Sequence, residues 1–323
     1  MKNLILHIGL PKTGTSSVQF ALSRARKEML RYGVLYPETG QWTDHSHHGL
    51  GFALRGVSDY GGQPVEAAET LLDALSEEYD KHPRIETVLI SSEIFQALVW
   101  PKRIAALKRL TDQFEHMKII AVLRRQDVLL ESLFKQHVKD PTMALAESVE
   151  EYLDRVGGWF NYKNFLSRWM DVFGHENLHL LPYNPRQSDS MVTEFANVLS
   201  AETGHTITLK PGKKQNLSLN GEGLAIKWRL NSEYPGVAEN ERLLQFIFEA
   251  ADCARKIQVF SRPQRQAILD RNFQNNLWMF NAFPDIDWSV FQNVQPVGQL
   301  IGQVPEQRIA EVRTAFQDVL NDL

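Results

Sequence analysis

Short apolar segments alternate with longer segments of helical spacing along the first part of the chain. The apolar segments are LILHIGL (4–10), VLYP (34–37), ETVLISS (86–92), MKIIAVL (117–123) and NLHLLPY (177–183). Strands separated by helices are typical of βαβ units that build a parallel sheet. The segments at 86–92 and 117–123 are apolar almost throughout, which is typical of strands that helices cover on both faces. The pattern therefore predicts an α/β fold, with an open parallel sheet flanked by helices.

Helical spacing predicts a helix between most of these strands and several more beyond the last one. The expected helices cover about 16–31, 65–81, 101–115, 126–138 and 162–173, and then 223–231, 240–256, 263–279 and 305–323. We predict a single domain over residues 1–323, with an α/β core at 1–205 and a mainly helical C-terminal region at 206–323.

One connection between the predicted strands is unusually long. Residues 41–64, QWTDHSHHGLGFALRGVSDYGGQP, are rich in glycine and histidine. Long connections in compact domains are often functional, so we predict a loop that lies over the site.

Composition and charge restrict the kind of partner. The chain has 323 residues, a formal net charge of -4 and a single cysteine, Cys253. This charge gives no reason to expect nucleic acid or an anionic membrane as partner, so any anion site must be built locally. No apolar segment approaches the ~20 residues of a membrane span. We predict a soluble, cytoplasmic protein without a transmembrane segment, for which a peripheral contact with a membrane surface stays open.

The first strand leads into a turn suited to holding phosphate. In GLPKTGTSS (9–17) a strand ends, a glycine-bearing turn follows, and a helix begins near Thr15. Free N–H groups at a helix start, nearby hydroxyls and the Lys12 cation all favour an anion. The Walker order G-x-x-x-x-G-K-[ST] is absent because Lys12 precedes Gly14. The alternative is an ordinary strand-to-helix turn capped by threonine or serine.

This turn resembles the 5′-phosphosulfate loop of sulfotransferases, which use 3′-phosphoadenylyl sulfate (PAPS) as sulfuryl donor. A second element strengthens the resemblance, since Arg124 ends a later strand and Ser132 follows about eight residues on. The family holds the ribose 3′-phosphate with such a pair. The resemblance covers roughly residues 1–183 and is closest to bacterial, carbohydrate-type sulfotransferases with a nucleotide-kinase-like sheet. It implies that the 5′-phosphosulfate contacts Lys12, Thr13, Gly14, Thr15, Ser16 and Ser17.

The spacing of Arg124 and Ser132 also has a physical reading. Arg124 leaves the carboxyl edge of the sheet, where open α/β folds bind ligands, and Ser132 lies about two turns into the next helix. An arginine fork and a hydroxyl can then share one phosphate. The alternative is that Arg124 and Arg125 pair with Asp127 or Glu131 on the surface. The Asn-Pro pair that usually follows the family's arginine is absent here.

A third, basic segment is similar to the part of sulfotransferases that closes over the nucleotide. In GKKQNLSLN (212–220), Lys214 and Asn216 would donate to the adenosine bisphosphate. A solvated basic loop explains the same residues.

Sulfuryl transfer needs a base for the acceptor proton and positive charge near the leaving oxygen. Lys12 suits the second role. For the first, Glu93 follows a predicted strand, and His47 and His48 lie in the long connection. Histidine has the more suitable reference pKa, about 6.5 against about 4.3, whereas the strand-end position favours Glu93. Both assignments stay open, and no metal is expected because no H-E-x-x-H or paired-cysteine motif occurs.

The resemblance implies PAPS as donor, adenosine 3′,5′-bisphosphate as product, and a hydroxyl of a carbohydrate or glycolipid as acceptor. Candidate aromatic residues for stacking on sugar rings are Trp42, Phe95, Trp100, Trp159 and Phe160. Two other hypotheses stay open. One is an ATP-dependent small-molecule kinase, which would need magnesium, and the other is a protein that binds adenosine 3′,5′-bisphosphate without turnover.

Overall fold

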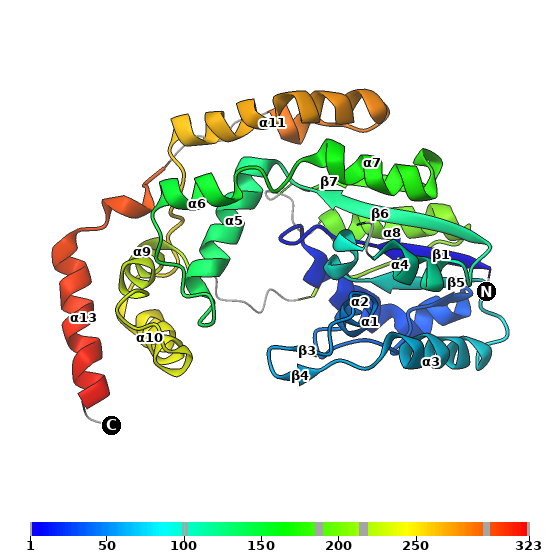
Figure 1. Ribbon diagram of the computed structural model, residues 1–323, viewed down its shortest axis with the longest axis horizontal. Coiled ribbons are helices and arrows are strands. Elements are labelled where there is room, and N and C mark those ends of the chain that lie inside the picture. The colour runs from blue at the N-terminus through cyan, green and yellow to red at the C-terminus, as the bar shows by residue number, and fades with distance from the viewer. Residues whose placement is uncertain are drawn as a thin grey trace. The chain divides into compact units, whose positions relative to one another are not determined.

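The computed structural model describes residues 2–98, 100, 103–184, 190–212, 219–292 and 298–321. Its centre is a sheet of parallel strands in the order β2-β5-β1-β6-β7 (Figure 1). The strands are β1 (Asn3–His7), β2 (Val34–Leu35), β5 (Thr87–Ser91), β6 (His116–Leu123) and β7 (Leu178–Pro182). Each coincides with a segment predicted from the apolar pattern, although β1 and β6 begin one residue earlier. The predicted α/β fold, with an open, nucleotide-kinase-like parallel sheet flanked by helices, is confirmed.

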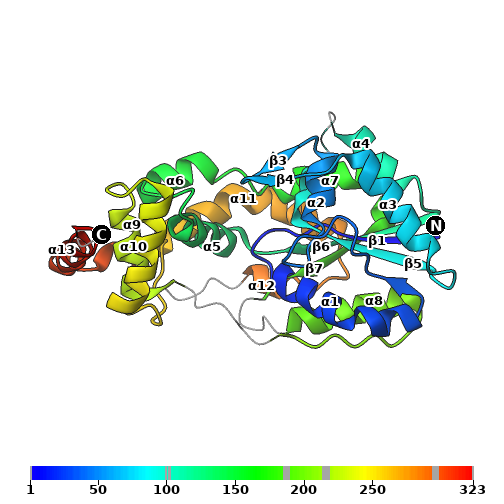
Figure 2. The ribbon, with the colours of Figure 1, turned by 90° about the horizontal axis from the view of Figure 1, so that it is seen from below.

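Helices cover both faces of this sheet (Figure 2). On one face, α1 (Thr15–Arg31) and α8 (Ser190–Thr203) pack against Ile5 and its neighbour in register, Leu89, in one apolar cluster. The other face carries α3 (Ala68–Asp80), α4 (Ile104–Thr111) and α7 (Tyr162–Phe173). Alternate residues of a strand point to opposite faces, so the apolar strand sequences bury both sides.

The prediction of a long loop over residues 41–64 was wrong in part. The segment contains the helix α2 (His48–Leu54) and a small hairpin of β3 (Asp59–Tyr60) and β4 (Gln63–Pro64). The helix was missed because it carries two glycines, which disfavour helices. Gly51 is required by packing, since a Cβ there would lie 2.8 Å from Cβ of Ile94.

The structure divides into two compact units. The first comprises Met1–Arg124, Tyr162–Lys213 and Met279–Gln292, and it contains the sheet and α12 (Ser289–Gln292). The second comprises Arg125–Asn161, Lys214–Trp278 and Asn293–Leu323. The single domain predicted over residues 1–323, with its division near residue 205, stays a prediction.

The second unit is helical. Its helices are α5 (Gln126–Lys139), α6 (Val149–Val156), α9 (Gly221–Leu230), α10 (Val237–Ala250), α13 (Glu306–Asn321) and all but the end of α11 (Arg262–Ala282). They enclose a separate apolar cluster that includes Phe134, Tyr152, Leu224 and Phe316. The predicted helical character of the C-terminal region is confirmed.

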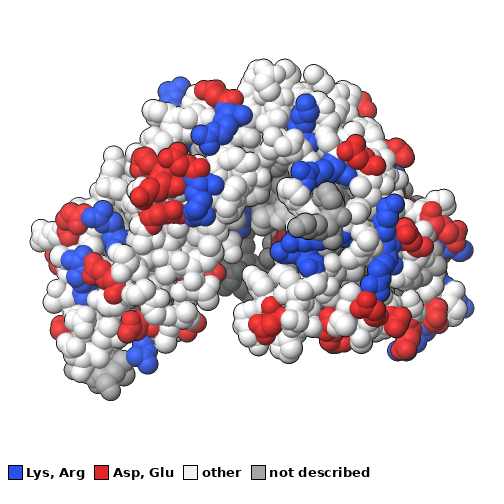
Figure 3. Space-filling model, in the orientation of Figure 1, with Lys and Arg blue, Asp and Glu red and all other residues white. Residues whose placement is uncertain are grey.

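Acidic and basic side chains are interspersed on the molecular face shown in Figure 3. Both signs occur over short distances, in keeping with the small net charge of -4.

Candidate functional site

The turn between β1 and α1 is shaped by three residues with left-handed backbone. Gly9, Lys12 and Gly14 have φ of 84, 62 and 83°. Gly14 is the N-cap residue of α1. The first N–H groups of a helix precede its backbone hydrogen bonds, which begin here with the bond from Ser17 to the Gly14 carbonyl at 3.0 Å. These groups and the helix dipole favour an anion over the turn. The local structure required for a phosphate loop is therefore present.

The two glycines also permit close approach of functional side chains. A Cβ on Gly9 would lie 2.8 Å from Cγ of Glu93, and a Cβ on Gly14 would lie 3.1 Å from the Tyr183 ring. Both positions thus need glycine for their backbone angle and for space.

The predicted hydroxyl residues of the turn occupy different environments. Thr13 is fully buried and donates its hydroxyl to the Leu10 carbonyl at 2.5 Å. Ser16 and Ser17 are exposed in the first turn of α1. Thr15 is buried and donates its hydroxyl to Glu93. The turn and a candidate base are therefore joined by a direct hydrogen bond.

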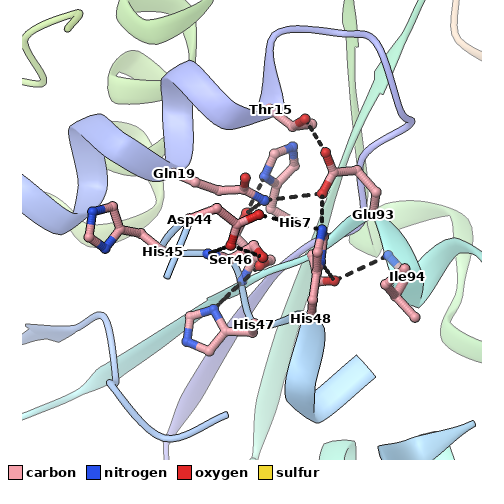
Figure 4. A network of polar contacts seen from close by, with 12 residues as sticks. His7, Thr15, Gln19, Asp44, His45, Ser46, His47, His48, Glu93 and Ile94 are labelled. Atoms are coloured by element: carbon pink, nitrogen blue, oxygen red, sulfur yellow. Dashed lines mark hydrogen bonds and ion pairs between the residues drawn. The ribbon is translucent and has the colours of Figure 1, made fainter. Parts of the chain in front are cut away.

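Glu93 lies just beyond β5, at the start of the short helix η1 (Glu93–Ala97). One carboxylate oxygen accepts the Thr15 hydroxyl, and the other accepts the Gln19 side-chain amide at 3.2 Å. The second oxygen is also 3.7 Å from Nε2 of His48 (Figure 4). The Glu93 side chain is 16% exposed, so the carboxylate is oriented by partners on α1 and α2 while keeping contact with solvent.

His48, the first residue of α2, faces this carboxylate. Its Nδ1 is 2.6 Å from the Ser92 hydroxyl oxygen, which accepts the Ile94 N–H at 3.1 Å. The Ser92 proton is therefore available for Nδ1, and we assign the ring proton to Nε2 on this basis. Nε2 then points between two carboxylates, Glu93 at 3.7 Å and Asp44 at 3.9 Å.

His47 points away from this group and is fully buried. Its Nδ1 accepts the Ser91 backbone N–H at 3.1 Å, and its Nε2 lies 3.1 Å from the Pro37 carbonyl. Through its two ring nitrogens, His47 thus links the segment that follows β2 with the end of β5. A second buried histidine, His7, places Nδ1 2.8 Å from the Ser91 hydroxyl.

Burial lowers the pKa of His7 and of His47 to about 4 each. The unfolded chain binds these protons near pH 6.5 and the folded chain does not, so stability is present above pH 6.5 and is lost as the pH falls. We expect the free energy of unfolding to decrease by about 2 kcal/mol per histidine between pH 6.5 and 5. Urea unfolding at pH 7 and pH 5 measures this.

The His47→Asn variant is the comparison for that measurement. It should be less stable than the parent at pH 7 and show a smaller loss between pH 7 and pH 5. An unchanged pH dependence would mean that His47 already binds a proton in the folded state.

Arg124 follows β6 at the carboxyl edge of the sheet. Its guanidinium donates to the Lys12 carbonyl at 2.5 Å and lies 5.1 Å from the centre of the Tyr183 ring, the ring that also covers Gly14. The Tyr162 hydroxyl donates to the Arg124 carbonyl. The predicted arginine is thus placed directly against the turn between β1 and α1.

The other predicted nucleotide contacts belong to the second unit. Ser132 is half-buried on α5. Lys214 and Asn216 lie outside the described residues. Arg125 is 3% exposed and pairs with Asp127 through contacts of 2.6 and 3.0 Å. This ion pair was one of the alternatives left open by the sequence, although it is buried and not on the surface.

Several residues of the site escaped the sequence analysis. Gln19 bridges the Ser91 hydroxyl and the Glu93 carboxylate at 3.2 Å each. It is four residues after Thr15, so helical spacing puts both on one face of α1. Ser91 and Glu93 likewise share a side by the two-residue period of a strand. These spacings could have pointed to Gln19 and Ser91 as residues of the site. No local pattern in the sequence marks Tyr183.

The candidate acceptor aromatics are also divided. Phe95 is fully buried, and Phe160 is partly buried against the core of the second unit. Trp100 and Trp159 are exposed, each beside an arginine. Trp42 is half-buried and meets the His48 ring edge-on at 5.8 Å.

Within the described parts of the chain, no group of three or more His, Cys, Asp or Glu side chains could hold a metal ion. In the same residues, no helix has the length and apolar character needed to cross a membrane.

Comparison with known proteins gives little further guidance. No protein-family model matches the chain, and no curated protein matches it. Among solved structures, the chain is similar to a sulfotransferase from Alicyclobacillus acidocaldarius, with 18% sequence identity and a TM-score of 0.38. The likeness covers 78% of this chain and 97% of that one. Because both values are low, the function must be argued from the site itself.

Proposed function

We propose that this protein is a PAPS-dependent sulfotransferase that transfers a sulfuryl group to a hydroxyl of a carbohydrate or glycolipid. One observation carries the proposal: Thr15, the first residue of α1, donates its hydroxyl to Glu93. An anion-binding turn and a carboxylate base therefore belong to one network. A sulfotransferase needs this combination, because the donor is an anion and the acceptor must lose a proton.

The residues of the turn fit the anionic end of the donor. In the proposed site Lys12, the N–H groups around Gly14 and the hydroxyls of Ser16 and Ser17 hold the 5′-phosphosulfate. Thr13 and Thr15 contribute their backbone, since their hydroxyls are engaged with Leu10 and Glu93. Arg124 would hold the 3′-phosphate, and the contacts that the resemblance implies for Ser132, Lys214 and Asn216 stay predictions.

When bound, PAPS supplies an activated sulfuryl group, whose bond to the bridging phosphate oxygen breaks as the bond to the acceptor oxygen forms. Glu93 takes the proton from the acceptor hydroxyl. His48 faces the carboxylate with Nε2, 3.7 Å away, and helps to orient it. Lys12 lies in the turn and stabilises negative charge on the departing bisphosphate. His47 has no role in this scheme because both its nitrogens engage the backbone.

The nucleotide specificity tests the proposal. We expect adenosine 3′,5′-bisphosphate to bind with micromolar affinity, more tightly than ADP or ATP and equally with magnesium or with EDTA. The reason is that Lys12 and Arg124 provide positive charge for two separate phosphates without a metal. Isothermal titration calorimetry of the full chain measures all three nucleotides. Preference for ATP with magnesium would instead indicate a kinase.

A further inference from the structure

An aromatic cluster extends from His48 to the molecular surface. Its members are Trp42, Phe52 on α2 and Tyr60 on the hairpin. The ring centres of Trp42 and Phe52 are 5.2 Å apart, those of Phe52 and Tyr60 4.2 Å apart, and the planes within each pair are 28 and 23° from parallel. The His48 ring meets Trp42 and Phe52 edge-on, at 5.8 and 6.3 Å. The cluster therefore begins at a residue of the proposed catalytic site.

The outer member of the cluster is exposed. Tyr60 is 54% exposed, although one face of its ring rests on Phe52. It is held by a tight two-residue turn in which Gly61 and Gly62 have φ of 61 and 80°, the conformation that such hairpins require. A large aromatic side chain is thus fixed in solvent by a rigid turn, which limits the entropy lost when a ligand binds it.

A cavity of about 390 Å³ adjoins the cluster, within the range of small-molecule sites. Its wall includes Trp42, Gly49, residues 39–41, and the acidic residues Glu38 and Glu66. The Glu38 carboxylate is paired with Arg26 at 2.5 Å. Carboxylates and backbone carbonyls accept hydrogen bonds from hydroxyl or ammonium groups, and they repel anions. The wall thus combines an aromatic surface with hydrogen-bond acceptors, and its negative charge comes mainly from Glu66, because the charge of Glu38 is paired with Arg26.

We propose that this cluster and cavity form the acceptor subsite, and that the acceptor is a neutral or amine-bearing sugar ring. The apolar face of a pyranose lies on an aromatic ring while its hydroxyls point outward to acceptors such as Glu38 and Glu66. Trp42 belongs to both the cavity wall and the cluster, and its ring meets the His48 ring at 5.8 Å, so a sugar bound against Trp42 lies on the side of the cluster that leads to Glu93. The negative wall disfavours uronic acids and glycans that are already sulfated. This inference rests on the proposed function for its assignment of the bound sugar as acceptor.

Saturation-transfer NMR tests the subsite without requiring turnover. The probes are methyl β-D-glucopyranoside, D-glucosamine and D-glucuronate, each with and without adenosine 3′,5′-bisphosphate. We expect transfer to the first two sugars and none to glucuronate. The signals should be lost in Tyr60→Ser and kept in Tyr60→Phe, which preserves the ring. They should also be kept in Phe273→Ser, which removes an equally exposed aromatic side chain from the second unit.

Equal transfer to glucuronate, no transfer to any sugar, or no effect of Tyr60→Ser would overturn the subsite. Circular dichroism and nucleotide titration of Tyr60→Ser establish that the variant is folded. If sugars bind through Tyr60 but adenosine 3′,5′-bisphosphate does not bind the parent protein, the subsite stands and the sulfotransferase proposal fails. If the nucleotide binds and the sugars do not, the sulfotransferase proposal stands and the acceptor subsite fails.

Discussion

Replacing Glu93 by glutamine is expected to lower the rate of sulfuryl transfer by about 10²–10⁴-fold, the usual contribution of a general base. Glutamine keeps the shape of the side chain and one oxygen that can accept the Thr15 hydroxyl, but it cannot take the acceptor proton. The affinity for adenosine 3′,5′-bisphosphate should therefore change by less than about threefold, because removing a general base weakens the transition state and not the binding of the nucleotide. Transfer from labelled PAPS to an acceptor found in a glycan screen measures the rate.

The matched control is Glu86→Gln, which changes an exposed glutamate just before the other end of β5. It should leave the transfer rate unchanged. The His48→Asn variant separates the two candidate bases, because it leaves the Glu93 carboxylate in place. A larger loss in His48→Asn than in Glu93→Gln would reassign the base to His48, and full activity in both variants would remove this network from the mechanism.

Replacing Arg124 by alanine is expected to weaken the binding of adenosine 3′,5′-bisphosphate by about 100-fold. Hydrogen bonds to charged groups contribute about 1.5–3 kcal/mol each, and 1.4 kcal/mol corresponds to a factor of about ten. ADP lacks the 3′-phosphate, so its affinity should fall much less. Calorimetric titration of both nucleotides into the same variant gives the ratio.

Arg124 also donates to the Lys12 carbonyl, so its loss changes the turn as well as the charge. The Arg124→Lys variant separates the two effects, since it keeps the positive charge but lacks the guanidinium that donates two parallel hydrogen bonds. It should bind the bisphosphate with intermediate affinity. Arg168→Ala is the control, because Arg168 also lies over an aromatic ring, that of Trp100, away from the turn. An equal loss of ADP and bisphosphate affinity in Arg124→Ala would show that Arg124 supports the turn and does not read the 3′-phosphate.

The framework of the site could be predicted from the sequence because its signals are local. The apolar segments before Gly9 and before Arg124 predict strands, and in a parallel sheet the carboxyl ends of strands share an edge. β1 and β6 are neighbours in the sheet, and Arg124 reaches the carbonyl of Lys12. The helix predicted at 162–173 has those bounds in the structure.

Two short helices, α2 and α6, were missed by the sequence analysis, for different reasons. α2 carries Gly49 and Gly51, and its stability comes from contacts with η1 and the 40–42 segment, which no local pattern reveals. The short α6 was also missed, although Ser148 and Glu151 form a capping box that is visible in the sequence. Tertiary packing overrides low helix propensity in the first case, and in the second the signal was present but not used.

By itself, the sequence determined the parallel α/β sheet, the turn with Lys12 and Gly14, the place of Arg124 at a strand end, and the short set of candidate bases. Only the tertiary structure shows where those candidates lie relative to the turn. His47 and His48 are adjacent, but successive residues at the start of a helix point in different directions, so one ring is buried against Pro37 and the other faces Glu93. The contacts of Glu93 with Thr15 and Gln19 join residues more than 70 positions apart. Such contacts depend on how α1, α2 and β5 pack together, and no local pattern of residues specifies that packing.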